Sequence, residues 1–308
     1  MDYSARKQKA FPSKETTLSY WIGEAEAKLA KHRTTEELPE QSDVLIIGSG
    51  LSGASVAFNL LEQTDEKVLL LEARDVCSGA TGRNGGHMRS YYHHDQYEFS
   101  KNYGQKVAAH IAIKEHENTS FGVYTPTSSV WPYKLVCGLL EIALSKGLNL
   151  QTNTAVEELE CLEDNTWLAK TPRGHVHAKK VVIATNAYTR ALLPDFWGKI
   201  TPVKGVVSHL QTESNKTLET NMVHTIPVEI DYISVQDDGS LIVGGGGQTY
   251  KTSPNREMMV DNADDSYFPE ETRQHFSEQV WQTLDLSTTT RGLGVWASQK
   301  TGFLLLVT

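Results

Sequence analysis

The chain has 308 residues, 39% of them hydrophobic and 22% charged, as in a globular protein with one large or two interleaved domains. Its net charge of −9 argues against nonspecific binding to nucleic acid. No apolar run approaches the ~20 residues of a membrane-spanning helix, and the N-terminus lacks the apolar core of a signal peptide. Three widely spaced cysteines, Cys77, Cys137 and Cys161, indicate neither a disulfide framework nor a metal site. We therefore expect a cytoplasmic protein with no nucleic-acid or membrane partner.

The first half of the chain predicts a β-α-β unit behind a polar extension. Two short apolar runs are typical of buried strands, and the apolar residues between them have helical spacing. In the extension we expect a short helix that packs Trp21 on the protein body. In chain order we expect a helix within 21–33, a strand at 43–50, a helix at 51–63, a strand at 66–74, a glycine-rich loop at 76–89 and a helix at 95–117.

The second half predicts one clear helix followed mainly by strands. The helix is bounded by Pro132 in its first turn and by Gly147 as a stop. Alternating apolar and polar residues then indicate short strands joined by hairpin turns. We expect the helix at 131–147, strands across 148–185 and 201–247, and an amphipathic helix at 268–284.

The sequence G-S-G-L-S-G lies between the first expected strand and helix, where a dinucleotide-binding fold requires it. Gly48 permits the tight turn, Gly50 lets the backbone approach a pyrophosphate, and Gly53 lets helix and strand pack closely. Glu72 ends the second strand, where it can accept hydrogen bonds from a ribose. The alternative is a glycine-rich turn without a ligand. The predicted cofactor-binding residues here are Gly48, Ser49, Gly50, Leu51, Ser52, Gly53 and Glu72.

NAD and FAD share this motif, so the choice between them depends on the next segment. The loop C-S-G-A-T-G-R-N-G-G-H can run along an extended cofactor and offers backbone amides and a guanidinium. The alternative is a flexible surface loop. The predicted contacts in this loop are Ser78, Gly79, Ala80, Thr81, Arg83, Asn84, Gly85 and Gly86.

Residues 43–61 and 68–87 together resemble the start of the D-amino-acid-oxidase-like FAD-dependent oxidoreductases, most closely the γ-glutamylputrescine-oxidase-like branch. Further blocks resemble the family in the same order, at 131–160, 179–188 and 231–247. The resemblance implies FAD and an α/β (α+β) fold, in which a Rossmann-like FAD-binding domain is interleaved with a shortened antiparallel β substrate domain. It also implies further cofactor contacts by Ala73, Arg74, Val156, Ala184, Thr185 and Asn186.

The chemistry that the resemblance implies is oxidation of a C–N bond in a small-molecule amine or amino acid. A hydride passes from the substrate carbon to the flavin, and O2 then accepts the electrons. The catalytic residue is unknown. His87 is a candidate because it ends the glycine-rich loop, although a loop histidine bonded to the backbone is the alternative. Two other interpretations stay open: a non-catalytic dinucleotide-binding remnant and an NAD-dependent dehydrogenase.

Two features depart from the family. Residues 118–130 are shorter than the corresponding part of the family's substrate domain, which indicates an internal deletion. The end of the chain, W-A-S-Q-K-T-G-F-L-L-L-V, replaces a family segment similar to G-F-S-K-D-G-F-P-F-V-G. One set of codons encodes both strings in different frames, so we hypothesise a frame or splice error; the alternative is a C-terminal strand that pairs with the sheet. We expect an N-terminal extension at 1–40, FAD-binding parts at 41–120 and 131–200, a substrate-domain remnant at 201–285 and an aberrant segment at 286–308.

Overall fold

The computed structural model describes part of the chain, and it divides the chain into two compact units. The first unit comprises Met1–Gly85 and Trp131–Thr308, and the second comprises Gly86–Val130. The residues that the structure describes are 11–13, 16–23, 25, 28–88, 128–197, 199–200, 205–210, 222–226, 229–245 and 305–307.

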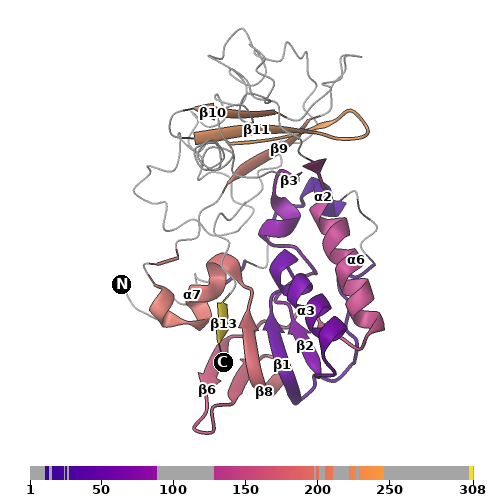
Figure 1. The fold of residues 1–308 in the computed structure, drawn as a ribbon. Coiled ribbons are helices and arrows are strands. Elements are labelled where there is room, and N and C mark those ends of the chain that lie inside the picture. The colour runs from indigo at the N-terminus through magenta and orange to yellow at the C-terminus, as the bar shows by residue number, and fades with distance from the viewer. Residues whose placement is uncertain are drawn as a thin grey trace, which may run out of the picture. The chain divides into compact units, whose positions relative to one another are not determined.

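The main sheet of the first unit has seven strands in the order β5-β2-β1-β8-β7-β6, and β13 also pairs with β8 (Figure 1). Strands β5, β2, β1 and β8 are parallel, whereas β6, β7 and β13 join antiparallel. The strand bounds are β1 Gln41–Ile47, β2 Val68–Leu71, β5 Asn149–Gln151, β6 Glu158–Cys161, β7 Trp167–Thr171, β8 Gly174–Ile183 and β13 Leu305–Val307.

Two long helices, α3 (Leu51–Gln63) and α6 (Pro132–Ser145), contact each other and share a core with one face of this sheet. Alternate strand residues such as Val44 and Ile46 pack in that core, while Leu45 and Ile47 pack on the opposite face. The second half of β1, Val44–Ile47, is covered on both faces and is entirely apolar, as buried parallel strands usually are. The short helices in the first unit are α2 Tyr20–Gly23, η1 Ala80–Arg83, η2 Asn186–Tyr188, α7 Thr189–Leu192 and η3 Pro194–Phe196.

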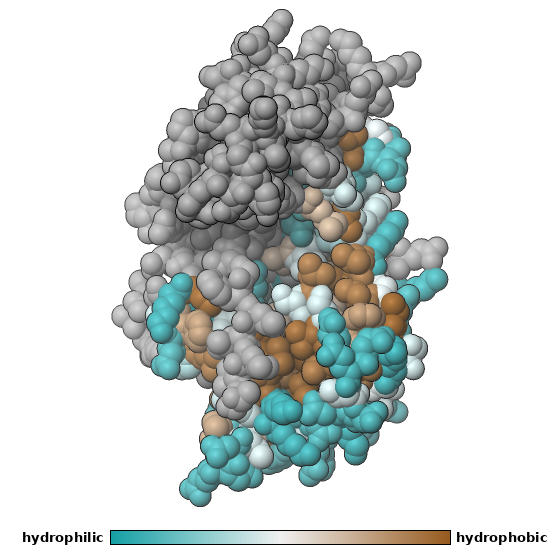
Figure 2. All heavy atoms as spheres, in the orientation of Figure 1, coloured by the Kyte–Doolittle hydropathy of each residue, from teal (hydrophilic) through white to brown (hydrophobic). Residues whose placement is uncertain are grey.

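Hydrophobic residues also lie on the outer surface of the helical layer. Figure 2 shows them over the region of α3 and α6, bordered by hydrophilic residues. Leu51 of α3 and Leu135 and Ile142 of α6 are 43%, 40% and 45% exposed. Within the described part of the chain, no helix is both long and apolar enough to cross a membrane.

A separate antiparallel sheet has the strand order β10-β11-β12-β9. Its Tyr232 lies opposite Gly244, and a Cβ atom at Gly244 would come within 2.2 Å of the tyrosine ring. The second unit contains an antiparallel pair of two short strands, β3 (His87–Met88) and β4 (Ser128–Ser129). The four strands are β9 Val206–Leu210, β10 Met222–Ile226, β11 Glu229–Val235 and β12 Leu241–Gly245.

The predicted fold class is confirmed, because the chain contains both a parallel β-α-β core and a separate antiparallel sheet. The helix expected within 21–33 was too long: α2 ends at Gly23, and 28–30 form a turn. The reason is that backbone groups at the end of this segment pair with distant parts of the chain: the Ala30 carbonyl accepts the Val76 N–H, and the His32 carbonyl accepts the Thr152 N–H. The helices expected at 95–117 and 268–284 lie outside the described residues. At the C-terminus, β13 pairs antiparallel with β8, as the alternative of a C-terminal strand expects. The frame hypothesis concerns the nucleotide sequence and stays a hypothesis.

Candidate functional site

The predicted cofactor residues gather where the parallel strands end. Gly48, Glu72 and Ala184 each follow directly after a strand of the main sheet. Hydrogen bonds tie these ends together: the Gly48 N–H donates to Leu71 O at 2.8 Å, and the Ala184 N–H donates to Ile47 O at 2.9 Å. The carboxyl edge of a parallel sheet is where folds of this type bind ligands.

The turn after β1 is closed so tightly that only glycine fits at two positions. Gly48 has φ +106°, and a Cβ atom there would lie 2.6 Å from Ala184 O. A Cβ atom at Gly53 would lie 1.9 Å from Gly48 O. The first glycine thus brings the turn against the end of β8, and the third lets α3 approach β1.

The N-terminus of α3 faces the same edge and can bind an anion. Gly50 is its N-cap and has no side chain to cap the helix, and the first helical bond runs from the Ala54 N–H to Gly50 O at 3.0 Å. The amides before Ala54 therefore have no partner inside the helix. The Leu51 N–H donates to Thr81 Oγ1 at 3.1 Å, which brings the glycine-rich loop to this helix end. Backbone amides and the helix dipole together favour a phosphate here.

Glu72 is held in place by three donors from the same site. Its Oε2 accepts from the Ser49 N–H at 2.9 Å and from Ser49 Oγ at 2.6 Å, and its Oε1 accepts from the Arg74 N–H at 2.9 Å. The buried Ser49 hydroxyl also accepts the Cys77 N–H at 2.9 Å. Ser49 therefore links the first motif, the carboxylate and the start of the loop. Since a carboxylate has about four lone-pair sites and three are in use, Glu72 can still accept about one ribose hydroxyl.

Arg83, which we expected to face the cofactor, is 2% exposed and is bound by its own chain. Its Nε donates to Ser78 O at 2.7 Å, and its two terminal nitrogens donate to Thr17 Oγ1 at 3.1 Å and to Thr17 O at 2.7 Å. A Cβ atom at Gly82 would lie 2.2 Å from Cys77 O, so the loop folds closely on itself. The sequence did not predict that Thr17 accepts hydrogen bonds from Arg83, since no motif marks Thr17.

The remaining predicted contacts divide between the two units. Val156 is buried between β5 and β6. Ala184, Thr185 and Asn186 follow β8, and Asn186 has φ +49°. Gly85 belongs to the first unit, whereas Gly86 and His87 belong to the second. There His87 pairs with Ser129, and the Val130 N–H donates to Gly86 O at 2.8 Å.

Cys77 lies at the start of the loop in the left-handed backbone region, with φ +54°. Burial raises the pKa of its thiol well above the usual 9.0, with smaller contributions from Cys137 and Glu72. A thiol that stays protonated is a poor nucleophile. Cys77 is therefore a packing residue, and not suited to form a covalent bond to a cofactor.

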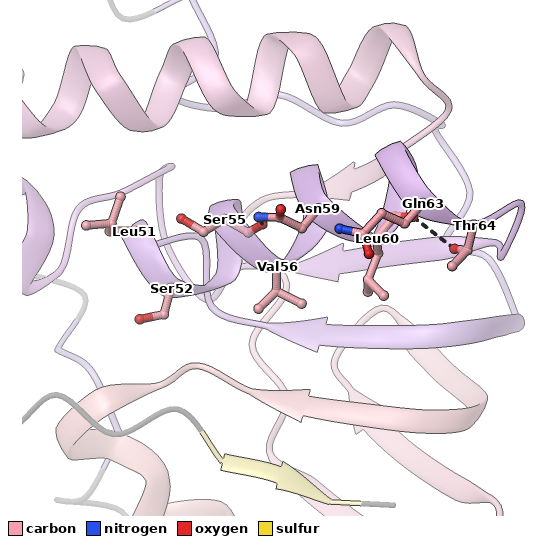
Figure 3. Close-up of a pocket in the computed structure, with 8 residues that line it drawn as sticks. All are labelled: Leu51, Ser52, Ser55, Val56, Asn59, Leu60, Gln63 and Thr64. Atoms are coloured by element: carbon pink, nitrogen blue, oxygen red, sulfur yellow. Dashed lines mark hydrogen bonds between the residues drawn. The ribbon is translucent and has the colours of Figure 1, made fainter.

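A groove of about 470 Å³ runs along α3 (Figure 3). All of its described lining comes from that helix and its C-cap, and Val56 and Leu60 point to the same side in Figure 3. The groove reaches the N-terminus of α3, where an anion can bind, only through Leu51 and Ser52 in the first helical turn. We therefore do not assign this groove to a dinucleotide. The residues that line it are Leu51, Ser52, Ser55, Val56, Asn59, Leu60, Gln63 and Thr64.

Comparisons with known proteins agree on one family. Residues 43–112 and 105–285 match the family described as FAD dependent oxidoreductase. The gamma-glutamylputrescine oxidoreductase of Escherichia coli (strain K12) is 26% identical over 239 residues, which are 75% of this chain and 54% of that protein. The chain thus spans about half the length of this curated relative.

Solved structures agree in fold. Glycine oxidase from Bacillus cereus has a TM-score of 0.59 and 19% identity, covering 84% of this chain and 82% of its own. L-alpha-glycerophosphate oxidase from Mycoplasma pneumoniae, solved with FAD bound, has a TM-score of 0.51 and 18% identity, covering 67% and 71%. At these identities the likeness shows a shared architecture.

Proposed function

The chain belongs to the family of FAD dependent oxidoreductases, and on that premise we propose that it oxidises a C–N bond of a small amine or amino acid with O2 as the acceptor. FAD is the cofactor of the family, which removes the NAD-dependent alternative. The amine class is supported by the names of the E. coli relative and of the B. cereus structure. The observation that carries the proposal is the carboxyl edge of the sheet, where an anion site and a fixed carboxylate meet.

The residues at this edge fit the adenosine diphosphate half of FAD. The glycine turn leaves no Cβ atom in front of the α3 amides, so a pyrophosphate can approach them. Glu72 stands at the end of β2 with its position set by Ser49, as a ribose acceptor requires. Val156 follows β5 at the same edge and is buried, so its backbone is proposed to contact the adenine.

The bound cofactor would supply the redox chemistry, accepting a hydride from the substrate carbon and passing electrons to O2. The chain's own residues bind and orient it. The α3 amides offset the charge of the pyrophosphate, Glu72 fixes the ribose, and the loop at 78–84 shapes the space beyond. Ala184, Thr185 and Asn186 are proposed to contact the cofactor from the end of β8. An amine that arrives neutral needs no strong base, so we assign no catalytic residue and keep His87 as the candidate.

A second function is favoured by the short connection at 118–130. Loss of part of the substrate domain would admit water to the reacting centre. In that case the chain would bind FAD without turning over an amine.

A peroxide assay separates the two functions. The protein is loaded with FAD and mixed in air with a panel of amines that includes glycine and γ-glutamylputrescine, with Gly53→Ala as a cofactor-free control. Peroxide from the wild type alone supports the oxidase. Loss of flavin colour without oxygen, and no peroxide in air, would mean an acceptor other than O2. If FAD is retained but stays oxidised with every amine, the result would support the second function, in which the chain binds FAD without turning over an amine.

A further inference from the structure

We propose that residues 17–21 form a strap that holds the loop at 78–84 in its cofactor-binding shape before FAD arrives. The proposal rests on the proposed function, since the loop is a cofactor loop only if FAD binds at this edge. It assigns a positioning role to an N-terminal segment that carries no recognised motif.

The strap donates hydrogen bonds to backbone carbonyls of the loop. Ser19 Oγ donates to Gly82 O at 2.5 Å, and Trp21 Nε1 donates to Asn84 O at 2.5 Å. In the opposite direction, Arg83 donates to both the carbonyl and the hydroxyl of Thr17. Three strap residues, spaced two apart, therefore engage three consecutive loop residues.

The strap side chains Ser19 and Trp21 and the loop guanidinium are buried, whereas their partners Thr17 and Asn84 are half-buried. Ser19 and Trp21 are each 1% exposed, and Arg83 is 2% exposed. The bond from Ser19 to the Gly82 carbonyl is fully buried. Because a buried carbonyl that loses its donor cannot easily recover the bond from solvent, this contact matters more than a surface hydrogen bond. A Cβ atom at Gly82 would lie 3.2 Å from Cδ1 of Ile22, so the residue that follows the strap packs against the loop as well.

The strap is anchored to the protein body independently of the loop. Trp131, the N-cap of α6, donates its Nε1 to Trp21 O at 2.8 Å. The rings of Tyr20 and Trp21 lie 5.2 and 5.5 Å from the ring of Trp131. The strap therefore connects a long, packed helix to the loop.

The loop benefits from such support because two of its seven residues are glycine. Gly79 and Gly82 raise the conformational entropy that the loop loses when it becomes ordered. Its own hydrogen bonds include Gly82 N–H to Gly79 O at 3.1 Å and Asn84 Nδ2 to Thr81 O at 3.0 Å. Ordering the loop in advance removes part of that entropy loss from the binding step.

The test compares Ser19→Ala and Trp21→Phe with a matched control, Trp167→Phe. Trp21→Phe removes the indole donor and keeps a large aromatic ring. Trp167 is also a buried tryptophan, but it lies in β7, in the core of the opposite sheet face, and its Nε1 has no hydrogen-bond partner among the described residues. Two readouts are used: hydrogen exchange of the loop amides without FAD, and the FAD dissociation constant from flavin fluorescence.

We expect both strap variants to speed exchange of the amides at 78–84 by about tenfold and to weaken FAD binding by about the same factor, because a buried carbonyl is left unpaired. Trp167→Phe should change neither quantity, even if it lowers the melting temperature. Unchanged loop exchange in both strap variants, or an equal rise in the control, would overturn the strap. A wild type that binds no FAD would instead refute the proposed function. Hydrogen exchange of the loop amides, which is measured without FAD, would still test whether the strap holds the loop.

Discussion

The turn at 48–53 and the loop at 78–84, both proposed to contact the cofactor, are built in different ways. The turn is determined by close approaches within the β-α-β unit, at Gly48 and Gly53. The loop is held by Ser19 and Trp21, which lie 63 positions earlier in the chain than their partners. A motif that is fixed by its own neighbours can be recognised from sequence alone. The loop can also be recognised from sequence, but its dependence on a distant segment cannot. The loop can therefore be weakened without changing the motif.

The largest expected effect follows from changing the turn itself. Gly53→Ala would place a Cβ atom 1.9 Å from Gly48 O, against backbone that cannot rotate away. We expect it to destabilise the protein by more than about 3 kcal/mol and to abolish FAD retention. Thermal melting and the flavin absorbance of the purified variant measure the two effects.

Gly138→Ala is the matched control for that substitution. Gly138 lies within α6, and a Cβ atom there would meet nothing within 4 Å. Because alanine favours a helix more than glycine does, we expect a gain of about 0.5–1 kcal/mol and unchanged FAD binding. Equal damage from both variants would mean that the close approach at Gly53 is not the cause.

The next largest effect is expected from changing Arg83, the buried arginine of the loop. Arg83→Lys keeps the charge but loses the planar guanidinium that reaches Ser78 and Thr17 together. We expect a loss of about 2–3 kcal/mol, since buried acceptors are left without donors. Chemical denaturation measures it. An unchanged unfolding midpoint would show that these contacts do not hold the loop.

A change at Glu72 should affect binding more than folding. Glu72→Gln keeps the shape of the side chain but removes the charge that accepts from Ser49 and Arg74. We expect FAD binding to weaken by about 10- to 100-fold, the range for hydrogen bonds to a charged group. Titration by flavin fluorescence gives the ratio. Wild-type affinity in this variant would remove Glu72 from the site.

Much of the fold was predictable because its signals are local. The helix at 51–63 has the expected bounds, since apolar periodicity and Gly50 define its start. The hydrogen bonds of Arg83 to Thr17 were not predictable, because a guanidinium in a glycine-rich loop could equally well contact a cofactor. The expected helix at 21–33 was too long for a similar reason, because the backbone carbonyls of Ala30 and His32 accept from the distant Val76 and Thr152, and α2 stops at Gly23. The proposed domain boundaries and cofactor contacts stay predictions.

The smallest expected effect is at alkaline pH and concerns the junction between turn and loop. The backbone N–H of Cys77 donates to Ser49 Oγ, and its carbonyl lies close to Gly82. Burial holds the pKa of the Cys77 thiol above the usual 9.0. Stability from a raised pKa is fully present below the unfolded value and is lost as pH rises toward the folded value. We expect Cys77 to contribute a fall of up to about 1.4 kcal/mol per pH unit above pH ~9. Cys77→Ala should flatten that slope in denaturation curves from pH 8 to 10.5; an unchanged slope would exclude this thiol as the source.

The most direct test of the account is the visible absorption spectrum of the purified wild type after incubation with FAD and removal of free cofactor. If the β1–α3 turn and Glu72 form an FAD site, the protein keeps a flavin band near ~450 nm that Gly53→Ala lacks. A wild type that is folded by thermal melting and retains no flavin would contradict the account.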